Sequence, residues 1–229
     1  MNDSIPLTEK GFPSDAWRLL SPRLTDKRRE KMLDVASKRS EHIRLVLQDI
    51  HDPHNIAACM RSAEAFGVLN IDVVNTYQKF AKPSTVARGA YHWLNFNKFE
   101  TISESVTNLR RKGYKIAAGF PAASCKLGDI PVDQPVAVLF GNEHQGVHSD
   151  WDAEIDYRFT IPMTGMVESL NISVSAALTM YTLMEKAKTV ISESELYLDD
   201  RSREHILSEW VCRHSRQYKS ELAILRQGQ

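Results

Sequence analysis

The sequence predicts an α/β fold in which a mostly parallel sheet is covered by helices on both faces. Short apolar segments of strand character alternate with segments of helical periodicity through the middle of the chain. This alternation favours parallel strands, because a parallel connection needs a long crossover that usually contains a helix. With 229 residues and 42% hydrophobic content, the chain can bury one sizeable core.

The N-terminal part is expected to be an irregular leader followed by a basic helix. Residues 1–22 contain three prolines and show little periodicity. Thr25 can cap a helix over 25–42 that carries a thin apolar stripe. Residues 23–44 hold eight basic and four acidic side chains, whereas the whole chain has a formal charge of zero. The basic charge is therefore local, and no global field draws the protein to nucleic acid or membranes.

The elements that follow are expected to alternate regularly. Predicted strands cover 43–50, 71–74, 115–119, 135–140 and 157–161, and 151–153 is ambiguous. Predicted helices cover 55–66, 100–112 and 169–188, and a C-terminal helix after 195 carries Ile206, Leu207, Trp210 and Val211 ahead of a polar tail. Gly67 and Gly113 stand where a glycine commonly ends a helix.

Composition and short motifs exclude several classes of protein. Cys59, Cys125 and Cys212 form no C-x-x-C pair, which is typical of a reduced, cytoplasmic protein without a disulfide framework. The chain begins without a signal pattern and has no apolar run long enough for a membrane span. Motifs for dinucleotides, P-loops and serine hydrolases are missing from the sequence. The histidine pairs at 51/54 and 144/148 lack further ligands, so we expect no metal.

The first of three informative segments is Asp52-Pro-His-Asn-Ile-Ala-Ala-Cys-Met-Arg61, which opens the predicted helix 55–66. Asn55 suits a helix N-cap, so a purely structural role is open to it. Arg61 lies on an alanine-rich helix, where it could simply pair with Glu64 one turn later.

The second segment joins a buried strand to a turn with a glycine at each end, Val138-Leu-Phe-Gly-Asn-Glu-His-Gln-Gly146. This turn places Glu143 at the carboxyl edge of the sheet, where open α/β sheets bind their ligands. An ordinary turn is the alternative. Glycines at both ends of a polar run are more than such a turn needs.

The third segment, Ile161-Pro-Met-Thr-Gly-Met-Val-Glu-Ser-Leu-Asn171, is predicted to be a binding loop that leads into a helix at Ser169. Ser173, Ser175 and two alanines occupy positions where a core helix usually carries large side chains. Small side chains sacrifice apolar burial but let a backbone or flat ligand approach closely. The first turn also offers unpaired N–H groups beside Ser169 and Asn171.

Together the three segments closely resemble the SpoU branch of the SPOUT RNA methyltransferases, and within it the TrmH-type tRNA (guanosine-2′-O)-methyltransferases. The first motif matches at Asn55 and Arg61, and the second at Gly141, Glu143 and Gly146. The third matches over 161–163, 165–167 and 169–171. The resemblance implies a deep trefoil knot in a domain spanning 45–190, with helical extensions over 1–44 and 191–229.

This resemblance also implies a cofactor, an oligomer and a set of site residues. S-adenosylmethionine would be held, largely by backbone groups, at Gly119, Leu139, Gly141, Ile161, Met163 and Leu170. A homodimer would bring the 55–66 segment of one subunit to the cofactor of the other. Glu143 would hold Arg61 or Asn55 across the dimer, and Ser169 and Asn171 would line the catalytic end of the pocket.

The implied reaction transfers a methyl group to a ribose 2′-hydroxyl, which makes RNA and not DNA the substrate. Because a guanidinium stays charged at neutral pH, we expect Arg61, the family's catalytic residue, to clamp a phosphate and orient the ribose. The cations expected to neutralise RNA phosphates are Arg28, Arg29, Lys38 and Arg39, although a solvated helix explains them equally well. Asn55 would lie near the ribose or aim Arg61.

The predicted target is the D-loop guanosine of tRNA, the Gm18 type. A 23S rRNA guanosine is the alternative, and the segment from Asp52 to Arg61 resembles those enzymes equally well. Many tRNA enzymes carry arginines after the third motif's helix, where this chain reads Glu185-Lys-Ala-Lys188. Two other classes stay open: a non-catalytic RNA-binding or assembly factor on the same fold, and a methyltransferase acting on small molecules.

Overall fold

The computed structural model describes residues 6–76, 88–215 and 217–227. Its contacts divide the chain into two compact units. One unit is Ser40–Leu196, and the other combines the described residues up to Arg39 with those from Tyr197 onward. The first unit extends further at both ends than the predicted domain at 45–190. The domain boundaries predicted from the sequence stay a prediction.

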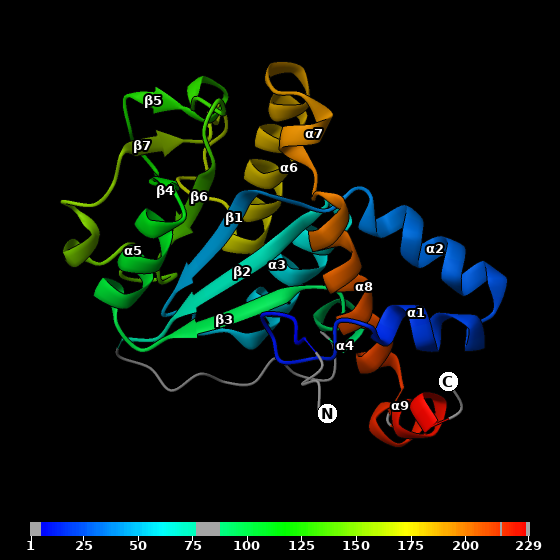
Figure 1. The fold of residues 1–229 in the computed structure, drawn as a ribbon. Coiled ribbons are helices and arrows are strands. Elements are labelled where there is room, and N and C mark those ends of the chain that lie inside the picture. Colours follow the sequence, from blue (N-terminus) through cyan, green and yellow to red (C-terminus); the bar gives the residue numbers. More distant parts are fainter. Residues whose placement is uncertain (1–5, 77–87, 216, 228–229) are drawn as a thin grey trace. The chain divides into compact units, whose positions relative to one another are not determined.

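A seven-stranded sheet forms the centre of the larger unit, as Figure 1 shows. Its strands are β1 (Ser40–Gln48), β2 (Val68–Val74), β3 (Asn95–Phe99), β4 (Lys115–Gly119), β5 (Cys125–Lys126), β6 (Val136–Phe140) and β7 (Tyr157–Thr160). The strand order is β3-β2-β1-β6-β4-β7-β5, and every pairing is parallel. The predicted α/β fold with a parallel sheet is confirmed. The trefoil knot stays a prediction.

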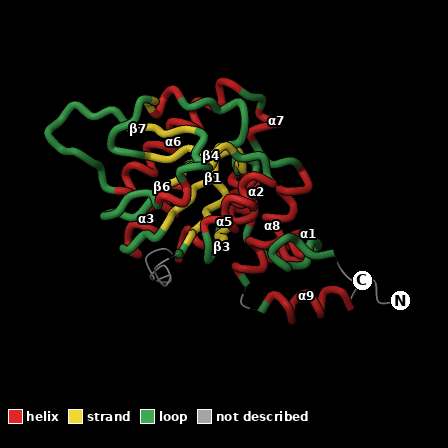
Figure 2. Tube along the Cα trace, turned by 90° about the vertical axis from the view of Figure 1, so that its left-hand side faces the viewer, coloured by secondary structure: helices red, strands yellow, loops and turns green. Residues whose placement is uncertain are grey.

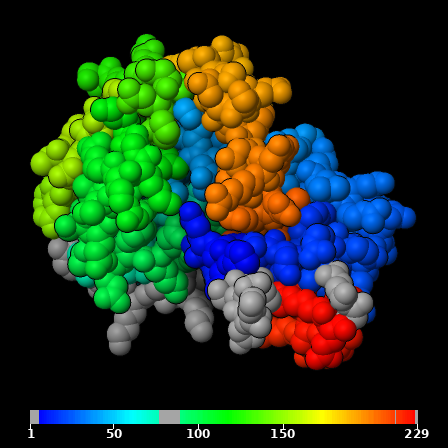
Figure 3. All heavy atoms as spheres, in the orientation of Figure 1, coloured from blue at the N-terminus to red at the C-terminus, as the bar shows by residue number. Residues whose placement is uncertain are grey.

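Helices cover both faces of this sheet, and Figure 2 shows them beside the strands. The helices and short 3₁₀ turns of this unit are α3 (Pro53–Ala65), α4 (Arg88–Tyr91), α5 (Ile102–Arg111), η3 (Leu127–Asp129), η4 (Ser149–Trp151), α6 (Ile172–Val190) and α7 (Glu193–Leu196). Helix α5 packs on one face of the sheet, and its residues form part of the surface in Figure 3. Helices α3 and α6 pack together on the other face.

Side-chain alternation along the strands divides the core between these two faces. Val46, Ala137 and Leu139 point toward α5 and join a buried cluster with Leu109 and Trp151. Every residue of β6 is buried, as expected for a central strand of a parallel sheet. Leu139 is thus committed to the α5 face, whereas its neighbour Phe140 faces the opposite side.

One ion pair lies inside this core. The Arg44 guanidinium donates to the Asp72 carboxylate at 2.9 Å, and the two side chains are 1% and 0% exposed. Asn97 also donates to this carboxylate at 2.7 Å, and the Tyr114 ring lies 4.9 Å from the guanidinium carbon. Buried charges persist when each is paired and hydrogen-bonded in this way.

Several helix boundaries differ from the prediction because side-chain caps decide them. Helix α3 begins at Pro53, and the Asp52 carboxylate caps it by accepting from the His54 N–H; the N-cap role suggested for Asn55 is therefore wrong. Helix α6 begins at Ile172 rather than Ser169, because Asn171 caps it by accepting from the Ser173 N–H at 2.8 Å. Gly67 adopts a φ of 81° directly after α3, as predicted.

The smaller unit is helical. It contains α1 (Ala16–Leu20), η1 (Ser21–Arg23), α2 (Asp26–Ala36), α8 (Asp200–His214) and α9 (Tyr218–Gln227). The predicted C-terminal helix is confirmed as α8, whose four marker residues are all buried. Three expectations are wrong: part of 1–22 is helical, the helix expected over 25–42 ends at Ala36, and α9 occupies the expected polar tail. None of the described helices is long and apolar enough to cross a membrane.

Candidate active site

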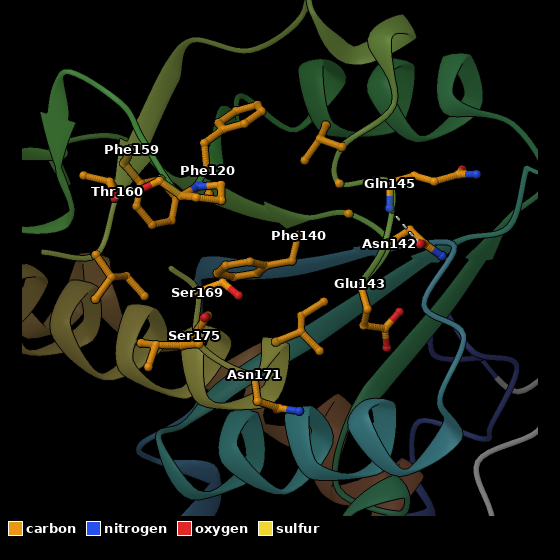
Figure 4. Close-up of a pocket in the computed structure, with 18 of the residues that line it drawn as sticks. Phe120, Phe140, Asn142, Glu143, Gln145, Phe159, Thr160, Ser169, Asn171 and Ser175 are labelled. Carbon is orange, nitrogen blue, oxygen red and sulfur yellow. Dashed lines mark hydrogen bonds between the residues drawn. The ribbon is translucent and has the colours of Figure 1, made fainter. Parts of the chain in front are cut away.

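A cavity of about 660 Å³ opens at the carboxyl edge of the sheet (Figure 4). Its walls come from the ends of β4, β6 and β7 and from the two loops that the sequence singled out. We call residues 141–147 the pocket loop. Sites at this edge are expected because the carboxyl ends of parallel strands converge there and the loops that follow are free to vary.

Two glycines are required by the shape of the pocket loop. A Cβ on Gly141 would lie 2.1 Å from the carbonyl oxygen of Gly146 and 2.3 Å from the amide nitrogen of Val147. Gly146 itself has a φ of 73°, which favours glycine. The side-chain oxygen of Asn142 accepts the N–H groups of His144 and Gln145 at 2.8 and 3.1 Å, and this closes the turn. The glycines therefore permit a tight turn beside the cavity.

The apolar wall of the cavity is aromatic. Phe140 and Phe159 meet edge to face with ring centroids 6.2 Å apart. Gly119 leaves room for one of these rings, because a Cβ there would lie 2.8 Å from the Phe140 ring. Ile161, Met163 and Leu170, which the sequence predicted as cofactor contacts, extend this wall.

The polar end joins three distant segments through hydrogen bonds within one chain. Asn171 Nδ2 donates to Asn55 Oδ1 at 3.1 Å, and Asn55 Nδ2 donates to Glu143 Oε1 at 2.9 Å. The His51 N–H donates to Glu143 Oε2 at 3.1 Å. The expected contact between Glu143 and Asn55 is therefore found within one chain rather than across a dimer. Whether Glu143 holds Arg61 across a dimer stays a prediction.

These hydrogen bonds control the charge of Glu143. Partial burial raises the pKa of its carboxyl, but the bonds from Asn55 and from the His51 N–H outweigh burial and hold that pKa below its usual value. Glu143 is therefore an ionised acceptor at neutral pH. Cys59 is a buried residue of α3, and burial, helped by the negative charge of Glu143, raises the pKa of its thiol to about 12. That thiol is not a reactive nucleophile.

Most predicted site residues converge on the cavity. Those that line it are Gly119, Gly141, Glu143, Ile161, Met163, Ser169, Leu170 and Asn171. Asn55 reaches it through the two hydrogen bonds above. Leu139 is fully buried toward α5 and lies outside the lining, so its side chain is unavailable to a ligand. Whether its backbone contributes stays a prediction.

Arg61 lies apart from the cavity of its own chain. It is exposed on α3 and is not among the lining residues. The suggested pairing with Glu64 is not found among the ion pairs of the described residues. The Arg61 side chain is therefore exposed on α3 and does not reach the cavity of its own chain.

The four cations predicted to bind RNA have different surroundings. Arg29 pairs with Asp26 at 2.9 Å, and Lys38 pairs with Asp34. Arg39 is only 1% exposed, with its guanidinium carbon 5.6 Å from the Trp210 ring centroid, so its predicted contact with RNA phosphates is wrong. Phosphate contacts by Arg28, Arg29 and Lys38 stay a prediction.

The sequence interpretation missed the aromatic wall and Asn142. Phe120 follows Gly119 at the end of β4, and Phe140 is the last residue of β6. Phe159 lies near the end of β7, and all three rings line the cavity. The convergence of parallel strands at one edge was the signal that could have revealed them. The anchoring role of Asn142 had no such signal, because the carbonyl to which its Nδ2 donates belongs to Asp49, 93 positions away in the sequence.

A parallel sheet with a ligand cavity at its carboxyl edge, built from an Asn segment, a Gly-bracketed Glu loop and a Ser-Leu-Asn loop, defines a SPOUT-type α/β protein. The chain belongs to the SpoU rRNA Methylase family, whose model matches residues 42–181. The resemblance inferred from the three motifs is thereby confirmed.

Individual relatives agree with this assignment. The tRNA (guanosine(18)-2′-O)-methyltransferase of Thermus thermophilus is 28% identical over 188 residues, which cover 82% of this chain and 97% of the relative. The Escherichia coli K12 protein of the same name is 28% identical over 75% of this chain and 74% of its own. The crystal structure of the Aquifex aeolicus TrmH/SpoU tRNA modifying enzyme matches with a TM-score of 0.74 at 24% identity, covering 82% of this chain and 97% of that one. The AdoMet complex of AviRb from Streptomyces viridochromogenes matches with a TM-score of 0.60 at 24% identity, over 69% of this chain and 65% of that one.

Proposed function

We propose that this protein is an S-adenosylmethionine-dependent RNA ribose 2′-O-methyltransferase that modifies guanosine 18 of tRNA as a cytoplasmic homodimer. The observation that carries the proposal is the polar end of the cavity. There Asn55, Glu143 and Asn171, one from each family motif, form a continuous hydrogen-bond chain. The relatives described above bear the name of this tRNA activity.

The cavity suits S-adenosylmethionine in size and chemistry. A volume of about 660 Å³ lies in the range of sites for ligands of this size. The Phe140 and Phe159 rings with Ile161 and Leu170 offer an apolar wall for an adenine. At Gly141 the absence of a side chain lets the two ends of the pocket loop lie against each other, because a Cβ there would be only 2.1 Å from the Gly146 carbonyl oxygen. The AdoMet complex of AviRb shares this fold.

When bound, S-adenosylmethionine supplies the methyl group: the ribose O2′ forms the new O–C bond as the S–C bond breaks, and the hydroxyl proton passes to water. The residues of the chain act by position. Glu143 is ionised and has both oxygens engaged, so it fixes Asn55 rather than removing the proton. Asn171 is oriented in turn by Asn55 and caps α6, which fixes the Ser169-Leu-Asn loop along the cavity.

The homodimer supplies the missing cation. Helix α6 presents Val174, Leu178 and Tyr181 on one face, each 42–52% exposed. Tyr181 meets Phe66 at the end of α3, with ring centroids 5.5 Å apart, so this apolar face lies next to the helix of Arg61. Pairing two subunits over this face hides the apolar side chains. It also brings the partner subunit's Arg61 toward the cavity, where it clamps an RNA phosphate and orients the ribose.

Labelled methyl transfer tests the function. The protein is incubated with methyl-labelled S-adenosylmethionine and unmodified tRNA transcript, and the product is digested and mapped nucleoside by nucleoside. We expect 2′-O-methylguanosine at position 18. A matched transcript with 2′-deoxyguanosine at that position should accept no label, since it lacks only the attacked hydroxyl.

Three results would contradict the proposal in different ways. Label in a 23S rRNA fragment but not in tRNA would indicate an rRNA enzyme. Binding of tRNA without any transfer would indicate an RNA-binding or assembly factor. Transfer to free guanosine in the absence of RNA would indicate a small-molecule methyltransferase.

A further inference from the structure

The carboxyl end of β1 holds both ends of the pocket loop. At one end, Asn142 Nδ2 donates to the main-chain carbonyl of Asp49 at 2.8 Å. Directly after the other end, the N–H of the next residue, His148, donates to Gln48 Oε1 at 2.9 Å. Gln48 is the last residue of β1 and Asp49 follows it, so two consecutive residues of a central strand anchor a loop about 100 positions further along the chain.

Asp49 has an unusual backbone. Its φ of 48° is the only positive φ of a non-glycine residue in the described part of the chain. Residues other than Asn, Asp and Gly seldom adopt this left-handed conformation. The surroundings hold it in place: the Asp49 N–H donates to the Val74 carbonyl at 2.9 Å, and its carboxylate accepts from the Thr76 N–H at 2.8 Å and Gln48 Nε2 at 2.9 Å.

Asn142 connects this anchor to the turn of the pocket loop. Its Nδ2 donates toward Asp49, while its Oδ1 accepts from His144 and Gln145, as Figure 4 shows in part. Its main-chain carbonyl also accepts from the Gly146 N–H at 2.8 Å. The side chain is buried, and both ends of its amide are used. A displacement of the Asp49 carbonyl would therefore move Asn142 and the turn together.

We propose that Gln48 and Asp49 are positioning residues that set the pocket loop for donor binding, with Asp49 acting through its left-handed backbone and Asn142. The inference rests on the proposed function, because every residue of the pocket loop lines the proposed donor cavity. Neither Gln48 nor Asp49 touches the cavity itself. Gln48 secures the second end of the loop through His148 and also orients the Asp49 carboxylate.

Substituting Asp49 by Gly and by Ala separates backbone from side chain. Both variants lose the carboxylate, but only glycine adopts the left-handed conformation without steric cost. We expect Asp49→Ala to raise the dissociation constant for S-adenosylmethionine about tenfold relative to Asp49→Gly, measured by calorimetry. Asp49→Asn, which also tolerates this conformation, should resemble wild type, and the KM for tRNA should change little in all three.

A double-mutant cycle provides the readout that general destabilisation cannot imitate. With Asn142 replaced by Ala, the Asp49 carbonyl no longer has its partner, so the difference between Gly and Ala at position 49 should shrink to about twofold or less. Leu109→Ala, which opens a cavity under the buried face of α5, is the matched control. It should lower the melting temperature and leave donor affinity unchanged.

Amide hydrogen exchange of residues 142–146 is measured without S-adenosylmethionine. It reports how firmly the pocket loop is held, so it tests the role of Asp49 whether or not the proposed function is correct. Faster exchange in Asp49→Ala than in Asp49→Gly supports the positioning role. Equal exchange and equal donor affinity in the two variants overturn it, as does a difference that persists in the Asn142→Ala background. A wild-type protein that binds no S-adenosylmethionine refutes the proposed function, while the exchange comparison still decides what holds the loop.

Discussion

Gly141→Ala is a minimal change at the start of the pocket loop, and the structure predicts a large effect. The added methyl group would lie 2.1 Å from the Gly146 carbonyl oxygen, 2.2 Å from its carbon and 2.3 Å from the Val147 nitrogen. All three atoms belong to the main chain, so no side chain can rotate away. The backbone of the loop must move instead.

The size of this movement follows from the contacts. Ordinary van der Waals contact for a Cβ begins at 3.4 Å, so the main chain at Gly146 and Val147 must move away by about 1 Å. Overpacking of this kind costs about 1–3 kcal/mol of folding stability. A misplacement of about 1 Å in a catalytic site lowers turnover by roughly 100-fold. We therefore expect kcat/KM to fall about 100-fold, with weaker donor binding and a lower melting temperature.

Gly165→Ala is the matched control for this substitution. It adds the same methyl group to the loop on the other side of the cavity, yet a Cβ there would meet nothing within 4 Å, and its φ is not positive. Methyl transfer to tRNA, donor affinity by calorimetry and thermal melting are measured for both variants. The steric reasoning is refuted if Gly141→Ala binds donor and turns over within threefold of Gly165→Ala.

Four further predictions follow from other parts of the structure. Arg61→Lys keeps the charge but loses the bidentate fork, so turnover should fall on the order of tenfold or more. Donor affinity measured by calorimetry should stay unchanged, and near-wild-type turnover would exclude the phosphate clamp proposed for Arg61. Glu143→Gln should destabilise the protein at pH 7. Because hydrogen bonds hold the folded pKa of Glu143 below its ordinary value of 4.5, its stabilisation is lost as pH falls below that value. The melting-temperature gap between variant and wild type should then narrow as the pH is lowered below 4.5, and a constant gap would contradict this. Arg44→Met leaves the Asp72 carboxylate buried without its cation and should lower the free energy of unfolding in urea by about 3–5 kcal/mol. Part of this stability should return when Asp72 is also made apolar, and a loss below ~1 kcal/mol would disprove the reasoning. Leu178→Glu places a charge on the exposed apolar face of α6 and should yield monomers in sedimentation velocity, whereas a variant that stays dimeric would place the interface elsewhere.

Local signals in the sequence predicted the fold well. The all-apolar segment 135–140 is predicted to be a strand, and it forms the fully buried β6. Gly67 and Gly113 adopt positive φ directly after their helices, as their positions implied. Boundaries that depend on competing caps were predicted less well. Asp52 rather than Asn55 caps α3, and Asn171 caps α6, which therefore begins three residues later than predicted. In both segments more than one nearby side chain is able to cap a helix, and local sequence does not decide between them.

The three motifs also predicted where the cavity lies, since strand ends and Gly-bracketed turns of a parallel sheet must meet at one edge. They could not predict which residues take part there. Leu139 and Phe140 are adjacent and equally apolar, yet strand alternation sends one to the α5 face and the other to the cavity. Arg39 belongs to a basic run in sequence but is buried over Trp210.

The sequence by itself determined the parallel α/β architecture, the family and the three segments that build the cavity, because strand burial, helix periodicity and glycine spacing act over a few residues. Only the tertiary structure decided that Asn55, Glu143 and Asn171 bond within one chain, that Arg61 stays outside its own cavity, and that Asp49 holds Asn142. The hydrogen bonds among these residues join positions that are roughly 90 or more apart in the sequence. Their geometry depends on the registry of strands and on the conformation of single backbone positions, which local residue patterns do not encode.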